Sequence, residues 1–221
     1  MPKSRRVKVV PLSKVKPKDR QHKEDLMHKI KAAIEEFPSV YTFTVDNLRT
    51  NLLQKIRDER REDTRIFLGN NKVMQLALGR DAESSAAPNL YKLSRMLTGL
   101  SGLMFTKLSK KEVKEYFGGV GGAVFARAGT TATVPFTIPA GPLPNFQHSI
   151  FDHLQKLGLP VKLDKGVIIV TNETRVCSVG DELSAQAAQV LKLFGVASAD
   201  FNIKLTGHWE DNVARKIADK A

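Results

Sequence analysis

Residues 40–79 read VYTFTVDNLRTNLLQKIRDERREDTRIFLGNNKVMQLALG. Aromatic and β-branched residues predict strands over 40–45 and 64–68, and Gly69 ends the second strand. Apolar residues after each strand return at helical spacing, so each strand is followed by a predicted helix. Strands that alternate with helices are typical of an α/β fold with helices packed on one sheet. We therefore expect an α/β sandwich.

Helical spacing of apolar residues and clusters of strand-forming residues also predict the elements in the rest of the chain. Helices are expected where apolar residues return about every three or four positions, and strands where β-branched residues cluster. The predicted helices are 21–37, a segment from an Asp46 cap through Ile56, 70–79, 88–100, 109–117 with a Ser109/Glu112 capping box, 145–157, and 182–194 capped by Asp181. The further predicted strands are 102–106, 131–138, a hairpin of 161–163 with 167–170, and 201–206.

The composition of the sequence changes after Phe117. The glycine-rich string at 118–122 predicts a flexible hinge, and the charge-poor residues that follow, up to 180, indicate a second, small α+β domain. The helix and strand after 180 are too short to fold alone. The pattern itself leaves open whether they return to the first domain.

Positive charge is concentrated in the first half of the chain. The formal net charge is +12; residues 1–110 hold 23 Lys/Arg and 12 Asp/Glu (23 − 12 = +11), and residues 111–221 hold 12 and 11 (12 − 11 = +1). This asymmetry indicates a nucleic-acid face on one part of the molecule, with a solvated tail or a nuclear-import signal as the alternative. Residues 1–20 form a basic arm that we expect to be ordered only against a polyanion.

No catalytic constellation is visible in the sequence. The five histidines lack metal-ligand spacing, and the single cysteine, Cys177, excludes an intrachain disulfide and a cysteine-built metal site. No phosphate-binding glycine motif is found, and no apolar run reaches the roughly eighteen residues of a membrane span. We therefore expect a non-catalytic protein that uses no cofactor or metal and does not enter a membrane.

Six strings together resemble one protein family. They are VYTFTVDNLR (40–49), LLQKIR (52–57), IFLGNNKVMQLALG (66–79), GLSGLMFT (99–106), FARAGTTA (125–132) and GDELSAQAAQVLKLFG (180–195). The strings resemble the ribosomal stalk-base family (large-subunit protein ten) from about Gln21 to Trp209. Within that family they are most similar to its assembly factors.

The resemblance implies a ribosomal-RNA-binding domain that is split by an insertion. The implied division is a basic N-terminal arm (1–20), an RNA-binding α/β domain (21–117 with 181–210), an inserted α+β domain (118–180) and a C-terminal tail (211–221). It also implies that the protein binds the RNA of the GTPase-associated centre on the pre-60S particle. There it acts as a placeholder, which the mature stalk-base protein later replaces.

The resemblance further implies the partners and the location. The sequence ends at Ala221, before the segments with which mature stalk-base proteins recruit acidic stalk dimers, so we expect no such dimers as partners. A neighbouring large-subunit ribosomal protein and a protein release factor are expected instead. The expected location is the nucleolus and nucleus, with a cytoplasmic pool on late precursors.

The family's RNA-binding face lies on the first helix and on the turns after the first two strands. The corresponding residues here are Lys23, Asn47, Arg49, Arg57, Gly69, Asn71 and Lys72. Gly69 would let a phosphate approach the backbone, and the helix start that follows would offer N–H donors. The family usually has Gly-Lys-Asn at this junction, whereas this chain has Gly69-Asn70-Asn71, so the role of Asn70 stays open. Few exposed aromatic side chains are expected, which favours recognition of RNA shape over base stacking.

Alternatives remain at this stage. Arg49 and Arg57 could form a solvated helix face, and the chain could be a permanent stalk-base protein of the large subunit. An RNA-turnover enzyme is a weaker alternative, because the sequence offers no acid/base or metal set for it. The last alternative is a protein–protein adaptor with a basic arm that serves only nuclear import.

Overall fold

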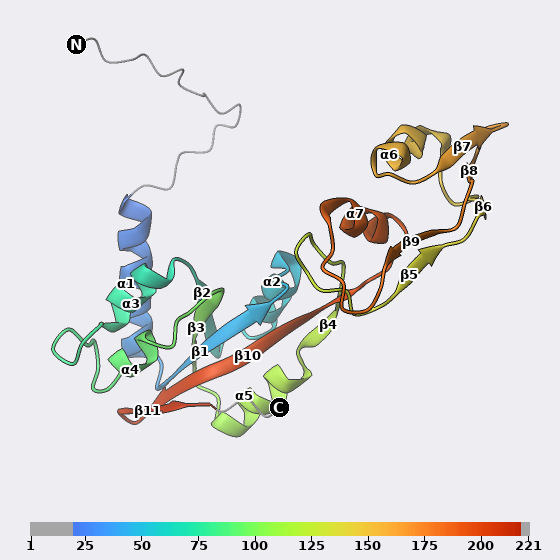
Figure 1. Ribbon diagram of the computed structural model, residues 1–221. Helices are drawn as coiled ribbons and strands as arrows, with labels where there is room; N and C mark the ends of the chain where they lie inside the picture. The colour runs from blue at the N-terminus through green and yellow to red at the C-terminus, as the bar shows by residue number, and fades with distance from the viewer. Residues whose placement is uncertain (1–19, 218–221) are drawn as a thin grey trace, which may run out of the picture.

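An antiparallel sheet organises the part of the chain that the computed structural model describes, residues 20–217 (Figure 1). Its strands are β1 (Ser39–Asp46), β2 (Thr64–Leu68), β3 (Ser101–Thr106), β4 (Gly121–Val124), β10 (Ala199–Glu210) and β11 (Val213–Lys216). They follow the order β11-β10-β1-β3-β2, and β4 pairs with the first part of β10. The sheet is strongly curled in Figure 1. The protein thus has the mixed α/β class expected from its sequence.

Helices lie on both faces of this sheet. They are α1 (Arg20–Glu36), α2 (Thr50–Glu59), α3 (Asn71–Leu78), α4 (Tyr91–Ser94) and α5 (Lys110–Gly119). Side chains alternate between the two faces of a strand. Val40 and Leu103 therefore share one core with α1, α3 and α4, while Tyr41 and Met104 share the opposite core with α2 and α5.

A β-bulge lets β10 contribute to both cores. Thr42 pairs with Gly207 and Phe43 with Leu205, so Thr206 has no ladder partner on β1, although its hydroxyl donates to the Thr42 hydroxyl (2.9 Å). An extra residue shifts the alternation of the strand after it. As a result, Ile203 lies in the core of α2 and α5, and Trp209 in the core of α1, α3 and α4, although both positions are odd-numbered.

The segment between β4 and β10 builds a smaller unit at one end of the sheet (Figure 1). Its elements are β5 (Phe136–Ile138), β6 (Gly141–Pro142), the 3-10 helix η1 (His148–Ile150), α6 (Phe151–Lys156), β7 (Val161–Asp164), β8 (Val167–Val170), β9 (Thr174–Cys177) and α7 (Ala185–Leu193). Ile138, Leu154 and Ile168 form a third core with Val190 of α7. Leu191 of α7 instead joins the core of α2 and α5, so this helix packs on both units.

Several sequence expectations are confirmed. Ser109 and Glu112 form the expected capping box at the start of α5. The β7–β8 hairpin turns at Lys165-Gly166, where both residues have positive φ (46° and 84°). The strands expected over 40–45 and 64–68 are β1 and β2.

Among residues 20–217, no helix has the length and apolar character needed to cross a membrane.

Other expectations are wrong because a distant partner changes the local structure. The glycine-rich string is no hinge, since Gly121 and Gly122 pair with Asn202 and Phe201 of β10. The helix expected over 88–100 is reduced to the four residues of α4, and Leu100 is 50% exposed. The tail expected from 211 contains β11, which pairs with β10.

The expected helix caps and the elements of the smaller unit also need correction. α2 begins at Thr50, so Arg49 and not Asp46 is its N-cap residue; the Asp46 carboxylate lies 2.8 Å from the Lys204 ammonium. Ser184 caps α7, whereas the Asp181 carboxylate accepts a hydrogen bond from the Ser178 amide. The strand expected over 131–138 is confined to 136–138, the helix expected over 145–157 is split into η1 and α6, and β9 was not predicted. The basic arm lies outside the described residues except for Arg20, which begins α1.

Gly102 provides a test of the packing at the centre of the sheet. A Cβ there would lie 2.5 Å from Phe43 Cζ and 2.7 Å from the Phe67 carbonyl oxygen. Gly102→Ala should therefore lower the free energy of unfolding by about 1–3 kcal/mol, measured by urea denaturation. Gly118→Ala is the matched control, because a Cβ on Gly118 in α5 meets no atom within 4 Å and should leave stability unchanged or raise it by up to ~1 kcal/mol. Equal stability of the two variants would contradict this packing.

Candidate nucleic-acid interface

The C-terminal ends of β1 and β2 lie at the same edge of the sheet. Both strands are antiparallel to β3, which lies between them, so they run parallel to each other. The turn before β3 ties the two ends together. The Leu100 carbonyl accepts a hydrogen bond from the Val45 amide (3.1 Å), and the Gly99 carbonyl accepts one from the Asn71 side chain (2.8 Å). This edge brings together five predicted residues: Asn47, Arg49, Gly69, Asn71 and Lys72.

Gly69 also places the first helix against this edge. A Cβ on Gly69 would lie 2.7 Å from Leu26 Cδ2 of α1. The absence of a side chain at Gly69 thus leaves room for the end of the Leu26 side chain, a contact additional to the phosphate approach expected from the sequence. Lys23 lies about one turn before Leu26 and is exposed. A sixth predicted residue is thus positioned beside the strand ends.

The asparagines of this edge hold turns. Asn47 has a φ of 51° and its side-chain Nδ2 donates to the Asp200 carbonyl (2.9 Å), so it is not a first-turn residue behind an Asp46 cap. The side-chain Nδ2 of Asn71 donates to the Gly99 carbonyl, and its Oδ1 accepts a hydrogen bond from the Ser101 hydroxyl (3.2 Å).

Asn70, whose role the sequence left open, is the N-cap residue of α3. Its Oδ1 accepts a hydrogen bond from the Lys72 amide (3.0 Å), which occupies one of the helix-start N–H donors expected for a phosphate. The ammonium groups of Lys23 and Lys72 remain on the surface of this edge, since both residues are exposed. The lysines are therefore the groups available to an anion there.

Arg57 lies about two turns along α2, in a hollow that is lined mainly by cationic and polar side chains. Its Nη2 donates to the Ile66 carbonyl (3.2 Å), and the hollow is also lined by Arg61 and Arg65. These two arginines were missed by the sequence analysis, because they lie among the acidic residues of a turn and at the start of a strand. Asp58 lines the same hollow.

Contacts with α5 hold the end of α2 in place. The Arg60 guanidinium lies 4.4 Å from the centre of the Tyr116 ring, and the Tyr116 hydroxyl donates to Glu59 (2.5 Å). Burial, followed by the interaction with Glu59, raises the pKa of Tyr116 to about 12. Tyr116 therefore remains protonated as a donor at neutral pH, and the orientation of α2 is fixed.

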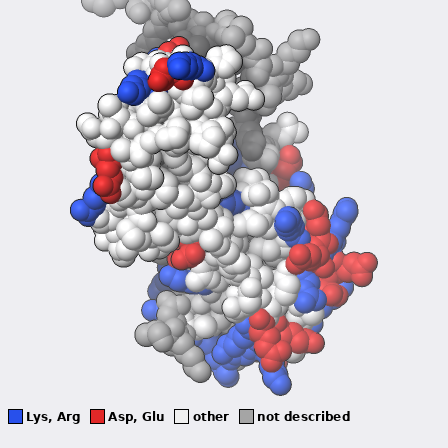
Figure 2. Space-filling model, turned by 90° about the vertical axis from the view of Figure 1, so that its right-hand side faces the viewer, with Lys and Arg blue, Asp and Glu red and all other residues white. Residues whose placement is uncertain are grey.

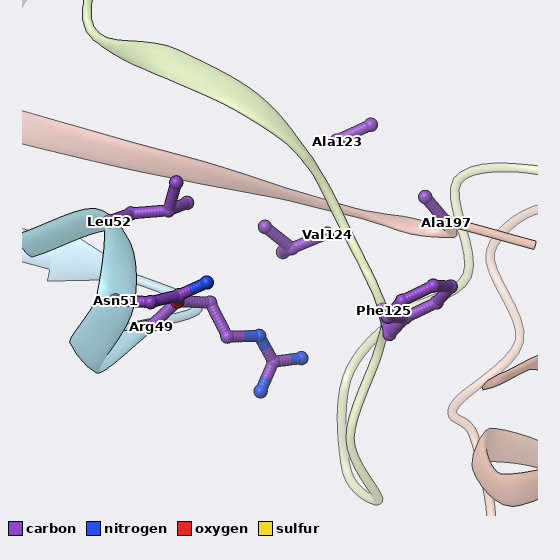
Figure 3. Close-up of a pocket in the computed structure, with 7 residues that line it drawn as sticks. All are labelled: Arg49, Asn51, Leu52, Ala123, Val124, Phe125 and Ala197. Carbon is purple, nitrogen blue, oxygen red and sulfur yellow. The ribbon is translucent and has the colours of Figure 1, made fainter. Parts of the chain in front are cut away.

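Arg49 lines a separate hollow between α2 and β4 (Figure 3). The other lining residues are Asn51, Leu52, Ala123, Val124, Phe125 and Ala197. Figure 3 shows the Arg49 guanidinium extending into the space beside α2, and the Phe125 ring where the chain leaves β4, turned toward Ala197. Burial, followed by repulsion from Arg127, lowers the pKa of Arg49. The sequence analysis missed Phe125 and Arg127 as surface groups, although both lie in the FARAG string.

The surface of the smaller unit is poor in charge. Residues 118–180 contain five Lys/Arg and three Asp/Glu (5 − 3 = +2). Figure 2 views the side on which β6, β7 and β8 lie in Figure 1 and shows a broad face with few charged side chains. The charged side chains gather on the rest of the visible surface. Among residues 20–217, no group of three or more His, Cys, Asp or Glu is arranged to hold a metal ion.

The chain is similar to known proteins over nearly its whole length. Residues 18–120 match the family model described as ribosomal protein L10, and residues 126–196 match the model of the insertion domain found in the 60S ribosomal protein of the same family. The ribosome assembly factor mrt4 of Neurospora crassa is 36% identical over 95% of this chain and 90% of its own length. The factor of the same name from Dictyostelium discoideum is 35% identical over 96% and 95%.

More distant relatives are ribosomal proteins. The large ribosomal subunit protein uL10 of Thermococcus sibiricus is 24% identical over 81% of this chain and 53% of its own length. The resemblance found in the six strings is thus confirmed. These relatives are named for ribosome assembly and for the large subunit, as expected of a non-catalytic protein.

Asn71 allows the role of the turn to be separated from that of the surface charge. Asn71→Ala removes both side-chain hydrogen bonds to the turn before β3, and should lower the free energy of unfolding by about 1–2 kcal/mol. Lys72→Ala, one residue along, removes an exposed side chain and should leave stability within about 0.5 kcal/mol. Chemical denaturation measures both. A stable Asn71 variant would show that the turn does not depend on this amide.

Proposed function

The chain belongs to the mrt4 family of ribosome assembly factors, within the ribosomal protein L10 family, and from this we propose that it acts in ribosome biogenesis by binding large-subunit ribosomal RNA. It binds the stalk site of the pre-60S particle, in the GTPase-associated centre, and holds the site until the mature stalk-base protein replaces it. The observation that carries the proposal is the 36% identity to an assembly factor over 95% of the chain.

The charge of the sheet edge supports RNA binding. Lys23, Arg49, Arg57 and Lys72 come from α1, from either end of α2 and from the start of α3, and none of them forms an ion pair within residues 20–217. Cations without internal partners are available to phosphates. The side chains of Asn47 and Asn71 shape the turns that carry these cations. Gly69 lies on this face where the Leu26 side chain of α1 approaches the end of β2.

Each part of the chain has its own role in this proposal. Residues 21–117 with 181–210 bind RNA, with help from the basic arm (1–20). The charge-poor residues 118–180 contact a neighbouring large-subunit ribosomal protein and the protein release factor. The corresponding location is the nucleolus and nucleus, with a cytoplasmic pool on late precursors.

The salt dependence of RNA binding tests the cationic face. Four phosphate contacts should make log K fall with log salt at a slope of about −3, by the release of roughly 0.7–0.9 counterion per contact. Arg57→Ala and Lys72→Ala should each reduce this slope by a little under ~1, in filter binding with a stalk-site RNA fragment. Lys156→Ala, in α6, is the control and should leave the slope unchanged. Binding that does not respond to salt would refute the proposed face.

The similarity to uL10 keeps a permanent ribosomal protein as the second candidate. Sedimentation of cell extracts in a sucrose gradient distinguishes the two. An assembly factor should be found with large-subunit precursors and be absent from polysomes. A constant amount of the protein per large subunit in polysomes would instead assign it to the mature ribosome.

A further inference from the structure

The hollow beside Arg49 lies where the chain passes between the sheet and the smaller unit. Phe125 follows β4 as the chain leaves the sheet, and Ala197 precedes β10 as it returns. The remaining walls come from the first turn of α2, with Leu52 as an apolar contact. Phe125 is 40% exposed, although Val124 beside it is buried. The hollow thus has an accessible aromatic ring at one end, near Ala197, and the Arg49 guanidinium at the other (Figure 3).

Arg49 lines this hollow, and Arg127 follows Phe125 by two residues and is exposed. Arg49 and Arg127 lie near enough to repel each other, and neither guanidinium forms an ion pair or a hydrogen bond within residues 20–217. Repulsion between two neighbouring cations is relieved when an anion binds between them. The two arginines therefore favour an anionic ligand.

We propose that this hollow binds one unstacked nucleotide of the RNA, with its phosphate between Arg49 and Arg127 and its base against Phe125. The inference rests on the proposed function and deepens it, because it adds base stacking to a face expected to read only the shape of the RNA. Unstacked bases are bound by aromatic side chains and by arginine planes in many RNA complexes.

Charge and position favour a nucleotide over an acidic peptide. Arg49 follows the end of β1, and Lys72 follows the end of β2 at the same edge of the sheet, so the hollow lies on the edge proposed to bind RNA. A nucleotide supplies both the anion for the arginines and a flat surface for the exposed ring. A carboxylate side chain would supply only the anion.

Variants of the two residues that the sequence analysis missed test the inference. Phe125→Ala should weaken binding of the stalk-site RNA fragment by about 5- to 150-fold, the loss typical of one stacked base, while its salt slope stays that of the wild type. Arg127→Ala should weaken binding and reduce the salt slope by roughly 0.7–0.9. Phe125→Trp should retain wild-type affinity.

Matched controls separate these effects from a damaged fold. Val179→Ala removes an apolar side chain that is 64% exposed, and Arg175→Ala removes an exposed arginine of β9; both lie outside the hollow and should bind RNA like the wild type. The fluorescence of the Phe125→Trp variant should be quenched by the RNA fragment. Trp209 of the wild type, which is buried and donates to the Pro88 carbonyl, should respond little.

RNA binding by the wild type, RNA binding by the variants and quenching of the Phe125→Trp variant together distinguish this inference from the proposed function. If the wild-type protein fails to bind the RNA fragment, the proposed function is refuted. If it binds and the Phe125 and Arg127 variants keep its affinity and slope, only the nucleotide site is refuted. Quenching of the Phe125→Trp variant by an acidic peptide, but not by RNA, would assign the hollow to a protein ligand and would also overturn the inference.

Discussion

The antiparallel pairing of β1 with β10 is the interaction on which the rest of the structure depends. It joins residues as far apart in sequence as Val40 and Trp209, so it closes a long loop and is costly in chain entropy. The ladder is reinforced at one end by the ion pair between Asp46 and Lys204. At the same end, Asn47 bonds the Asp200 carbonyl and directs the chain into α2. The position of Arg49 is therefore set by a strand that begins about 150 residues later in the sequence.

Local pattern was sufficient for the elements whose signals are local. The β-branched run of β1, the Ser109 capping box and the Lys165-Gly166 turn each specify their conformation within a few residues. The pattern failed where a distant strand decides the outcome. Gly121 and Gly122 have no strand propensity, yet they pair with β10 because a free edge is present there.

The residues of the candidate site also fall into those that local sequence could identify and those that depend on distant contacts. Its cations could be named in advance because the strings around them resemble those of a known family, and the exposed lysines need no special geometry. The roles of Asn70 and Asn71 could not, since they depend on hydrogen bonds within α3 and to the turn before β3. Phe125 and Arg127 were missed for a similar reason. Their significance arises only when β4 is placed beside the start of α2.

The strand nature of residues 121–124 has a mechanical consequence. The smaller unit is carried by two neighbouring strands of the sheet, β4 and β10, rather than by a loose tether. A force that pulls this unit away along β10 loads the β10–β1 ladder in shear, so that many hydrogen bonds resist it together instead of opening one at a time.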